Sequence, residues 1–113
     1  GLMPKALNRL SPFHTSIYIT DVGSLGIGPV FHHIYDFGTT SVFMAIGKKE
    51  TELIRGSDGS LEDKKVIRLR FTVDERICDG YYYAESIRSM KRMLKNPEVL
   101  EQPPASTPAD AWI

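Results

Sequence analysis

The chain has 113 residues, 42% hydrophobic and 25% charged, a composition typical of one soluble globular domain with a modest core. Its 14 basic and 14 acidic residues give zero net charge, which argues against a dedicated nucleic-acid binder or a protein of anionic membrane surfaces. The single cysteine, Cys78, excludes a disulfide within the chain and suits a reducing compartment such as the cytoplasm. No apolar run reaches the ~18 residues that a membrane-spanning helix needs.

The N-terminal segment, residues 1–14, is expected to be an irregular lead-in, because Pro4 and Pro12 interrupt any long helix. A strand is predicted directly after it, over residues 16–20. In that strand the apolar side chains alternate with polar ones, as in a sheet that is apolar on one face.

The middle of the chain predicts a hairpin. A glycine-rich loop over residues 21–28 and an ambiguous stretch at 30–35 precede it. Residues 41–54 read as one strand, whose apolar run at 42–46 indicates burial on both faces. Residues 64–74 alternate cleanly and form the second strand. The two are expected to pair antiparallel through a long, polar connection.

The C-terminal part predicts one helix that begins at Asp79, a suitable N-cap. An apolar stripe at spacings of four, three and four runs along it: Tyr83, Ile87, Met90 and Leu94. Asn96 and Pro97 end the helix, and Pro97 can open one further short turn. The tail, residues 101–113, is expected to be extended or disordered unless a partner holds it. Together these elements predict an α+β fold, a two-layer arrangement in which an antiparallel or mixed sheet packs on the helix.

The segment Asp74-Glu75-Arg76-Ile77-Cys78-Asp79-Gly80 resembles the Asp-His-Arg-x-x-Asp-Gly signature of the dihydrolipoyl acyltransferases. These are the acyltransferase cores of 2-oxo-acid dehydrogenase complexes and are related to chloramphenicol acetyltransferase. In that family the signature follows a strand and opens the last long helix. The same order is predicted here, and the segment 93–97 resembles the end of the family's helix.

Two upstream segments extend the resemblance. Residues 19–26 are similar to the family's Ile-Ser-Asn-Leu-Gly-x-x-Gly stretch, and residues 41–47 are similar to its Val-Ala-Ile-Leu-Gly strand. The likeness runs from about residue 15 to about residue 100, in the family's order. Because the family's domain is considerably longer, residues 1–113 are expected to be the C-terminal part of such a domain, a half of the chloramphenicol-acetyltransferase-like architecture.

The resemblance implies acyl transfer between a thioester and a thiol, with coenzyme A or dihydrolipoamide as substrate. No metal is expected, because the chain has only three histidines and one cysteine. In the family a histidine deprotonates the thiol, and a serine or threonine hydroxyl of a neighbouring subunit stabilises the oxyanion, which is chemically apt. Thr20 occupies that hydroxyl position. Asp79 occupies the last position of the signature, where the family's Asp holds the catalytic loop through an ion pair. The family's active site lies between subunits of a trimer, so a homotrimer is expected.

Glu75 stands where the family has its catalytic histidine. Ordinary pKa values are about 6.5 for His and about 4.3 for Glu, so a carboxylate is the weaker base for a thiol unless burial raises its pKa. Three interpretations stay open. Glu75 is an unconventional base, or the domain is a non-catalytic assembly module of the same fold, or the chain is a small binding domain whose motif match is accidental.

Other residues carry weaker alternatives. Cys78 is a nucleophile or a small apolar side chain before the helix, and the second is favoured. His32 and His33 line a thiol channel, act as a displaced base, or form a loop pair at a subunit contact; too few ligands accompany them for a zinc site. Arg68 and Arg70 pair with phosphates of coenzyme A, or lie on a solvated face with cross-strand partners such as Glu50 or Glu52.

Three further features complete the sequence-based expectations. The glycine-rich loop lacks the Lys-Ser/Thr ending of a P-loop, so it is interpreted as a turn. Of the tyrosines at 81–83, only Tyr83 lies on the apolar stripe of the helix. A half-domain exposes a sheet edge and apolar surface, so self-association is expected.

Overall fold

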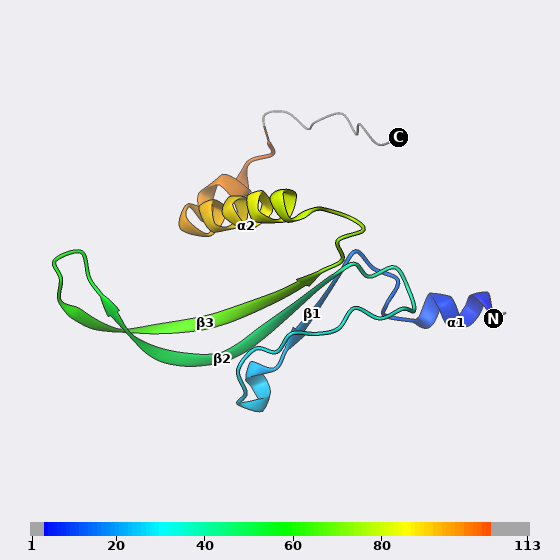
Figure 1. Cartoon of the computed structure of the whole chain (residues 1–113), viewed down its shortest axis with the longest axis horizontal. Helices are drawn as coiled ribbons and strands as arrows, with labels where there is room; N and C mark the ends of the chain where they lie inside the picture. The colour runs from blue at the N-terminus through cyan, green and yellow to red at the C-terminus, as the bar shows by residue number, and fades with distance from the viewer. Residues whose placement is uncertain (1–3, 105–113) are drawn as a thin grey trace. The chain divides into compact units, whose positions relative to one another are not determined.

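The computed structural model describes residues 4–104 (Figure 1). These residues divide into two units, one that ends at Ile77 and one that begins at Cys78. The first unit carries the sheet and the second carries the long helix. Within residues 4–104, no helix combines the length and the apolar character needed to cross a bilayer. The content is mixed α+β, which confirms the predicted fold class at that level.

The sheet has three strands in the order β1-β2-β3. The strands are β1 (Ile17–Asp21), β2 (Val42–Arg55) and β3 (Leu61–Val73). β1 pairs with β2 in parallel, and β2 pairs with β3 antiparallel, so the sheet is mixed, one of the two alternatives that the sequence left open. The parallel pair requires a crossover, and residues 22–41 supply it.

The β2–β3 hairpin is longer than the sequence indicated and extends beyond β1 (Figure 1). β3 begins at Leu61 rather than 64, so the connection is only residues 56–60. Charged residues fill both faces of the strand at 62–65, which hides the period-two signal. Inside the turn the Asp58 carboxylate accepts from the Ser60 backbone N–H at 3.0 Å and from its hydroxyl at 2.6 Å. The Gly59 φ of 83° suits glycine.

The crossover runs over one face of the sheet. After the short 3-10 helix η1 (Gly23–Leu25), Pro29 lies against Gly47 so closely that a Cβ there would meet the proline ring at 2.3 Å. Farther along, the rings of His32 and Tyr35 lie 5.3 and 5.9 Å from the ring of Phe43. Phe43 is the largest fully buried side chain among the described residues, so the core sits under this loop. The stretch 30–35 is neither strand nor helix, which resolves that ambiguity.

The lead-in contains a short helix, α1 (Lys5–Leu10), where an irregular segment was expected. Pro4 occupies the N-cap position, where a missing N–H costs nothing, and Pro12 follows the helix end, so the two prolines bound the helix. The chain then attaches to the start of β2 through the Phe13 carbonyl oxygen. That oxygen accepts from the Thr39 N–H at 2.8 Å, the Thr40 N–H at 3.1 Å and the Thr40 hydroxyl at 2.8 Å.

The second unit holds α2 (Gly80–Lys95) and the short helix η2 (Pro97–Glu101). Both boundaries confirm the prediction from Asp79 and Pro97. Tyr83, Ile87 and Met90 are half-buried, whereas Leu94 is 65% exposed. The tail prediction falls mostly on residues 105–113, outside the described part of the chain.

Candidate functional site

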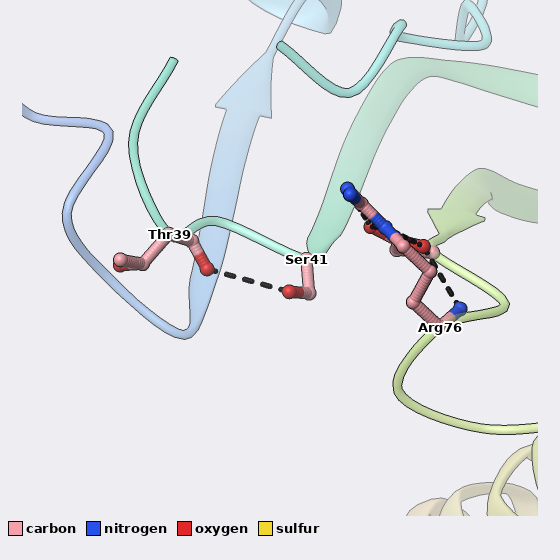
Figure 2. Close-up of polar contacts among 4 residues, drawn as sticks. Thr39, Ser41 and Arg76 are labelled. Atoms are coloured by element: carbon pink, nitrogen blue, oxygen red, sulfur yellow. Dashed lines mark hydrogen bonds and ion pairs between the residues drawn. The ribbon is translucent and has the colours of Figure 1, made fainter. Parts of the chain in front are cut away.

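The strand β3 passes directly into the signature segment. The Asp74 N–H donates to the Ser41 carbonyl oxygen at 2.9 Å, one step beyond the last ladder pair, and the Ile77 N–H closes a turn on the Asp74 carbonyl at 3.0 Å. On the neighbouring segment, the Ser41 hydroxyl donates to the Thr39 carbonyl oxygen at 3.3 Å (Figure 2). The segment that carries Glu75 is therefore fixed to the sheet at its first residue.

The Asp74 carboxylate and the Arg76 side chain bind each other across Glu75. One carboxylate oxygen accepts from the Arg76 backbone N–H at 2.9 Å, and the other accepts from Nε at 2.8 Å and from Nη2 (Figure 2). These hydrogen bonds to Arg76 lower the pKa of Asp74, and the same contact raises the pKa of Arg76. The only signal for this pair in the sequence is an acidic and a basic residue two positions apart around a turn.

Glu75, the residue at the base position, is exposed at the tip of this turn. Its flanking residues bind each other, so the Arg76 guanidinium is committed to Asp74. The turn therefore presents the Glu75 carboxylate outward. Its side chain is exposed to solvent and not part of the core of its own unit.

Thr20 lies near the end of β1 that is farther from the signature segment. It is half-buried in β1 and aligned with Ala45 on β2, which is in turn aligned with Arg70 on β3. Directly after β1, the Asp21 carboxylate accepts from the Gly23 N–H at 2.8 Å and the Ser24 N–H at 3.3 Å, which forms the predicted turn.

The structure does not bring Thr20 and Glu75 together. The row of Thr20 meets β3 at Arg70, and Asp74 lies four residues farther along the same strand direction. At the rise of a strand, four residues span roughly 13 Å. A single chain therefore holds the proposed hydroxyl and the proposed base at separate positions of the first unit.

Asp79 belongs to the second unit and caps α2. Its carboxylate accepts from the Tyr82 N–H at 2.8 Å, and the Tyr83 N–H donates to its carbonyl oxygen at 3.0 Å. The ion pairs found within residues 4–104 do not include Asp79. Cys78, just before it, is a half-buried free thiol.

The histidines are dispersed. The His32 ring stacks on Phe43, the His14 ring meets Phe37 edge-on at 5.4 Å, and His33 is exposed. Across the described part of the chain, no three His, Cys, Asp or Glu side chains gather as metal ligands. His32 is thus engaged with the core ring under the crossover.

The two arginines of β3 behave differently. Arg68 binds Glu50 at 2.6 Å and also binds Glu52, the cross-strand partners that the sequence suggested. Arg70 instead places its guanidinium carbon 4.4 Å from the centre of the Phe31 ring. Of the three tyrosines, those at 81 and 82 are 76% and 66% exposed, while the third is half-buried on the apolar stripe.

A comparison with models of protein families gives a match. The model of the 2-oxoacid dehydrogenases acyltransferase (catalytic domain) family matches residues 9–101, most of the chain. A search of the curated proteins found no match. The matched range covers the resemblance drawn from the signature and from its two upstream segments. The chain therefore belongs to the family of 2-oxoacid dehydrogenase acyltransferase catalytic domains.

Proposed function

We propose that this domain transfers an acyl group between a thioester and a thiol, with coenzyme A or dihydrolipoamide as the thiol carrier. Membership of the acyltransferase family supports acyl transfer as the general activity. In this proposal the fold is that of a chloramphenicol-acetyltransferase-like half-domain, and the compartment is the cytoplasm. The proposed roles are base for Glu75, oxyanion donor for Thr20 and loop support for Asp79.

The family match over residues 9–101 carries the proposal of acyl transfer. The separation of Thr20 from Glu75 within one chain bears on how the site is assembled. An oxyanion donor must lie within hydrogen-bond distance of the reacting carbonyl oxygen, which the thiol attacks beside the base. Roughly 13 Å of strand between the two positions is too far for one substrate carbonyl. A neighbouring subunit that supplies Thr20 removes the difficulty, so we propose that the site is completed in a homotrimer.

The site must then remove the proton of the thiol and stabilise the negative charge of the oxyanion. The Glu75 carboxylate takes the thiol proton, the thiolate attacks the thioester carbonyl, and the Thr20 hydroxyl donates to the developing oxyanion. The tetrahedral intermediate collapses with expulsion of the original thiolate, which recovers the proton. A carboxylate in place of a histidine makes the first step slower, and loss of a general base typically costs about 10² to 10⁴ in rate.

The test is acetyl transfer from acetyl-coenzyme A to dihydrolipoamide, measured for the wild type, Glu75→Gln and Glu75→His. We expect a slow wild-type rate, a lower rate for Glu75→Gln, and for Glu75→His a rise within the range of about 10² to 10⁴ that a general base contributes. Glu62→Gln, on the exposed hairpin, is the matched control and should leave the rate unchanged. Equal rates for the wild type and Glu75→Gln would contradict the role of Glu75.

The second candidate is a non-catalytic assembly module of the same fold. Glu75 at the position of the family's histidine favours it, because a carboxylate is ordinarily the weaker base for a thiol. Background rates for the wild type, Glu75→Gln and Glu75→His, together with a stable oligomer, would establish this candidate and exclude the first.

A further inference from the structure

Arg70 and Arg68 occupy the same face of β3 but are held in different ways. Arg68 is neutralised by two carboxylates, Glu50 and Glu52. Within the part of the chain that the structure describes, the ion pairs do not include Arg70. Within the described segments, no acidic side chain therefore compensates the charge of Arg70, although Arg70 lies only two residues from Arg68.

The guanidinium of Arg70 is nevertheless positioned. Its carbon atom lies 4.4 Å from the Phe31 ring centre, well within the range of a cation–π contact. Phe31 belongs to the crossover, which is anchored on both sides of that residue. Pro29 lies against Gly47, and His32 stacks on Phe43. An arginine that lies against an aromatic ring keeps its N–H donors free at the ring's periphery, so it is prepared to bind an anion.

Arg70 lies in register with Thr20, the proposed oxyanion donor, across the sheet. Thr20, Ala45 and Arg70 form one row across the three strands, so their side chains leave the same face of the sheet. Two strand spacings, about 10 Å, separate the Cα atoms of Thr20 and Arg70. Ala45, between the two, is buried under the crossover, and a substrate that reaches Thr20 lies within the electrostatic field of Arg70.

We propose that Arg70, supported by Phe31, binds an anionic group of the acyl-transfer substrate. The chemistry of that group is a phosphate or carboxylate oxygen, which the guanidinium binds through charge-assisted hydrogen bonds. Two parts of a thioester could supply it: the phosphates of coenzyme A, or a carboxylate on the acyl chain. This inference rests on the proposed function for the identity of the substrate, and it goes beyond that function by naming a residue for substrate selection.

The first experiment measures dissociation constants by calorimetry for the wild type, Arg70→Gln and the matched control Arg68→Gln. The ligands are coenzyme A, pantetheine, succinyl-pantetheine and butyryl-pantetheine. For the anionic ligand that uses the site, Arg70→Gln should weaken binding by about 10-fold or more, while the Arg68 variant should change it little. A loss confined to coenzyme A over pantetheine assigns the phosphates, and a loss confined to succinyl-pantetheine assigns the acyl carboxylate.

Two further measurements keep the result decisive. Inorganic pyrophosphate tests the anion site without any thiol: wild-type binding that Arg70→Gln loses supports the inference, even if no thiol ligand binds and the proposed function fails. Phe31→Leu should give an intermediate loss, because it removes the ring but keeps the charge. Equal affinities of the wild type and Arg70→Gln for coenzyme A, succinyl-pantetheine and pyrophosphate would overturn the inference.

Discussion

In the signature segment, the contact between Asp74 and Arg76 fixes the backbone on both sides of Glu75. The Asp74 carboxylate binds both the side chain and the backbone N–H of Arg76, and so it closes a loop around Glu75. Asp74 is also tied to Ser41 by its own N–H. The direction of the exposed Glu75 side chain is thus set by contacts that Glu75 does not make itself. The acid–base role proposed for Glu75 depends on that support.

The Asp74–Arg76 contact predicts a pH-dependent stability. The pKa of Asp74 is lowered in the folded state by its hydrogen bonds to Arg76, so the contact stabilises the fold above the ordinary carboxyl pKa of 3.8. Its contribution falls as the pH drops through the lowered folded-state pKa, where the folded carboxylate takes up its proton. Arg76→Gln should therefore be less stable than the wild type at pH 7, and the difference should shrink below pH 3.8.

The measurement is the urea midpoint of both proteins between pH 7 and pH 2.5. Arg55→Gln, an exposed arginine at the end of β2, is the control and should follow the wild type throughout. A difference between the wild type and Arg76→Gln that is constant across this range would show that the loss comes from packing rather than from charge.

At the scale of elements, the strength of the local signal decided what the sequence could predict. The period-two alternation at 66–73 and the helical stripe after Asp79 gave β3 and α2 because each repeats over several residues. The helix α1, with only six residues, shows no such repeat. The path of the crossover was also missed, since ring stacking on Phe43 joins residues that are distant in sequence.

The sequence proposes a candidate site to the same extent. The resemblance points to Thr20, Glu75 and Asp79 because motifs are local. The contact between Phe31 and Arg70 was not predictable, since it joins the crossover to β3 across the sheet. The close approach of Pro29 to Gly47 explains why the crossover can lie so near: any side chain at position 47 would displace it. The spacing of residues along the chain does not reveal that Pro29 and Gly47 lie in contact.

Because Asp79 caps α2, its replacement should measurably lower the stability of the helix. The Asp79 carboxylate satisfies the Tyr82 N–H, one of the donors that lack a partner within the helix. Asp79→Ala should destabilise the helix by about 1 kcal/mol, whereas Asp79→Asn keeps an acceptor oxygen and should lose much less. Thermal unfolding followed by circular dichroism at the helix band measures both.

The pair of Asp79 variants also separates the cap from the proposed loop support. If Asp79 acts only as a cap, Asp79→Asn retains both stability and acetyl transfer. If its charge supports the catalytic loop, Asp79→Asn keeps the helix but loses activity. Equal stability of Asp79→Ala and the wild type would contradict the cap itself.

On the scale of the whole molecule, the two faces of the sheet are unlike. The face of Phe43 lies under the crossover, whereas the opposite face carries apolar side chains that remain in part accessible. Ile17, Ile19 and Leu69 belong to this second face, and they are 41%, 53% and 38% exposed. Clustered apolar side chains of this kind mark surfaces that contact other protein.

The exposed apolar face and the separated site residues lead to one prediction about assembly. A trimer would cover the exposed apolar face and would supply Thr20 to the Glu75 of a neighbour. Burial of the apolar face and completion of the site therefore both favour the trimer. Light scattering coupled to size exclusion should give three times the chain mass of 12.7 kDa. Ile19→Lys places a charge on the apolar face and should shift the mass toward the monomer, because burying an unpaired charge is costly.

Leu10→Lys, at an 80% exposed position at the end of α1, is the matched control and should keep the wild-type mass. A clean monomer of the wild type at micromolar concentration would contradict the assembly, and with it the completion of the site by a neighbour. Acyl transfer by such a monomer would have to proceed at Glu75 without Thr20, and Thr20→Ala would then leave the rate unchanged. A trimeric mass should therefore occur together with a lower rate for Thr20→Ala, and a monomeric mass with an unchanged rate. Assembly and chemistry are thus tested together.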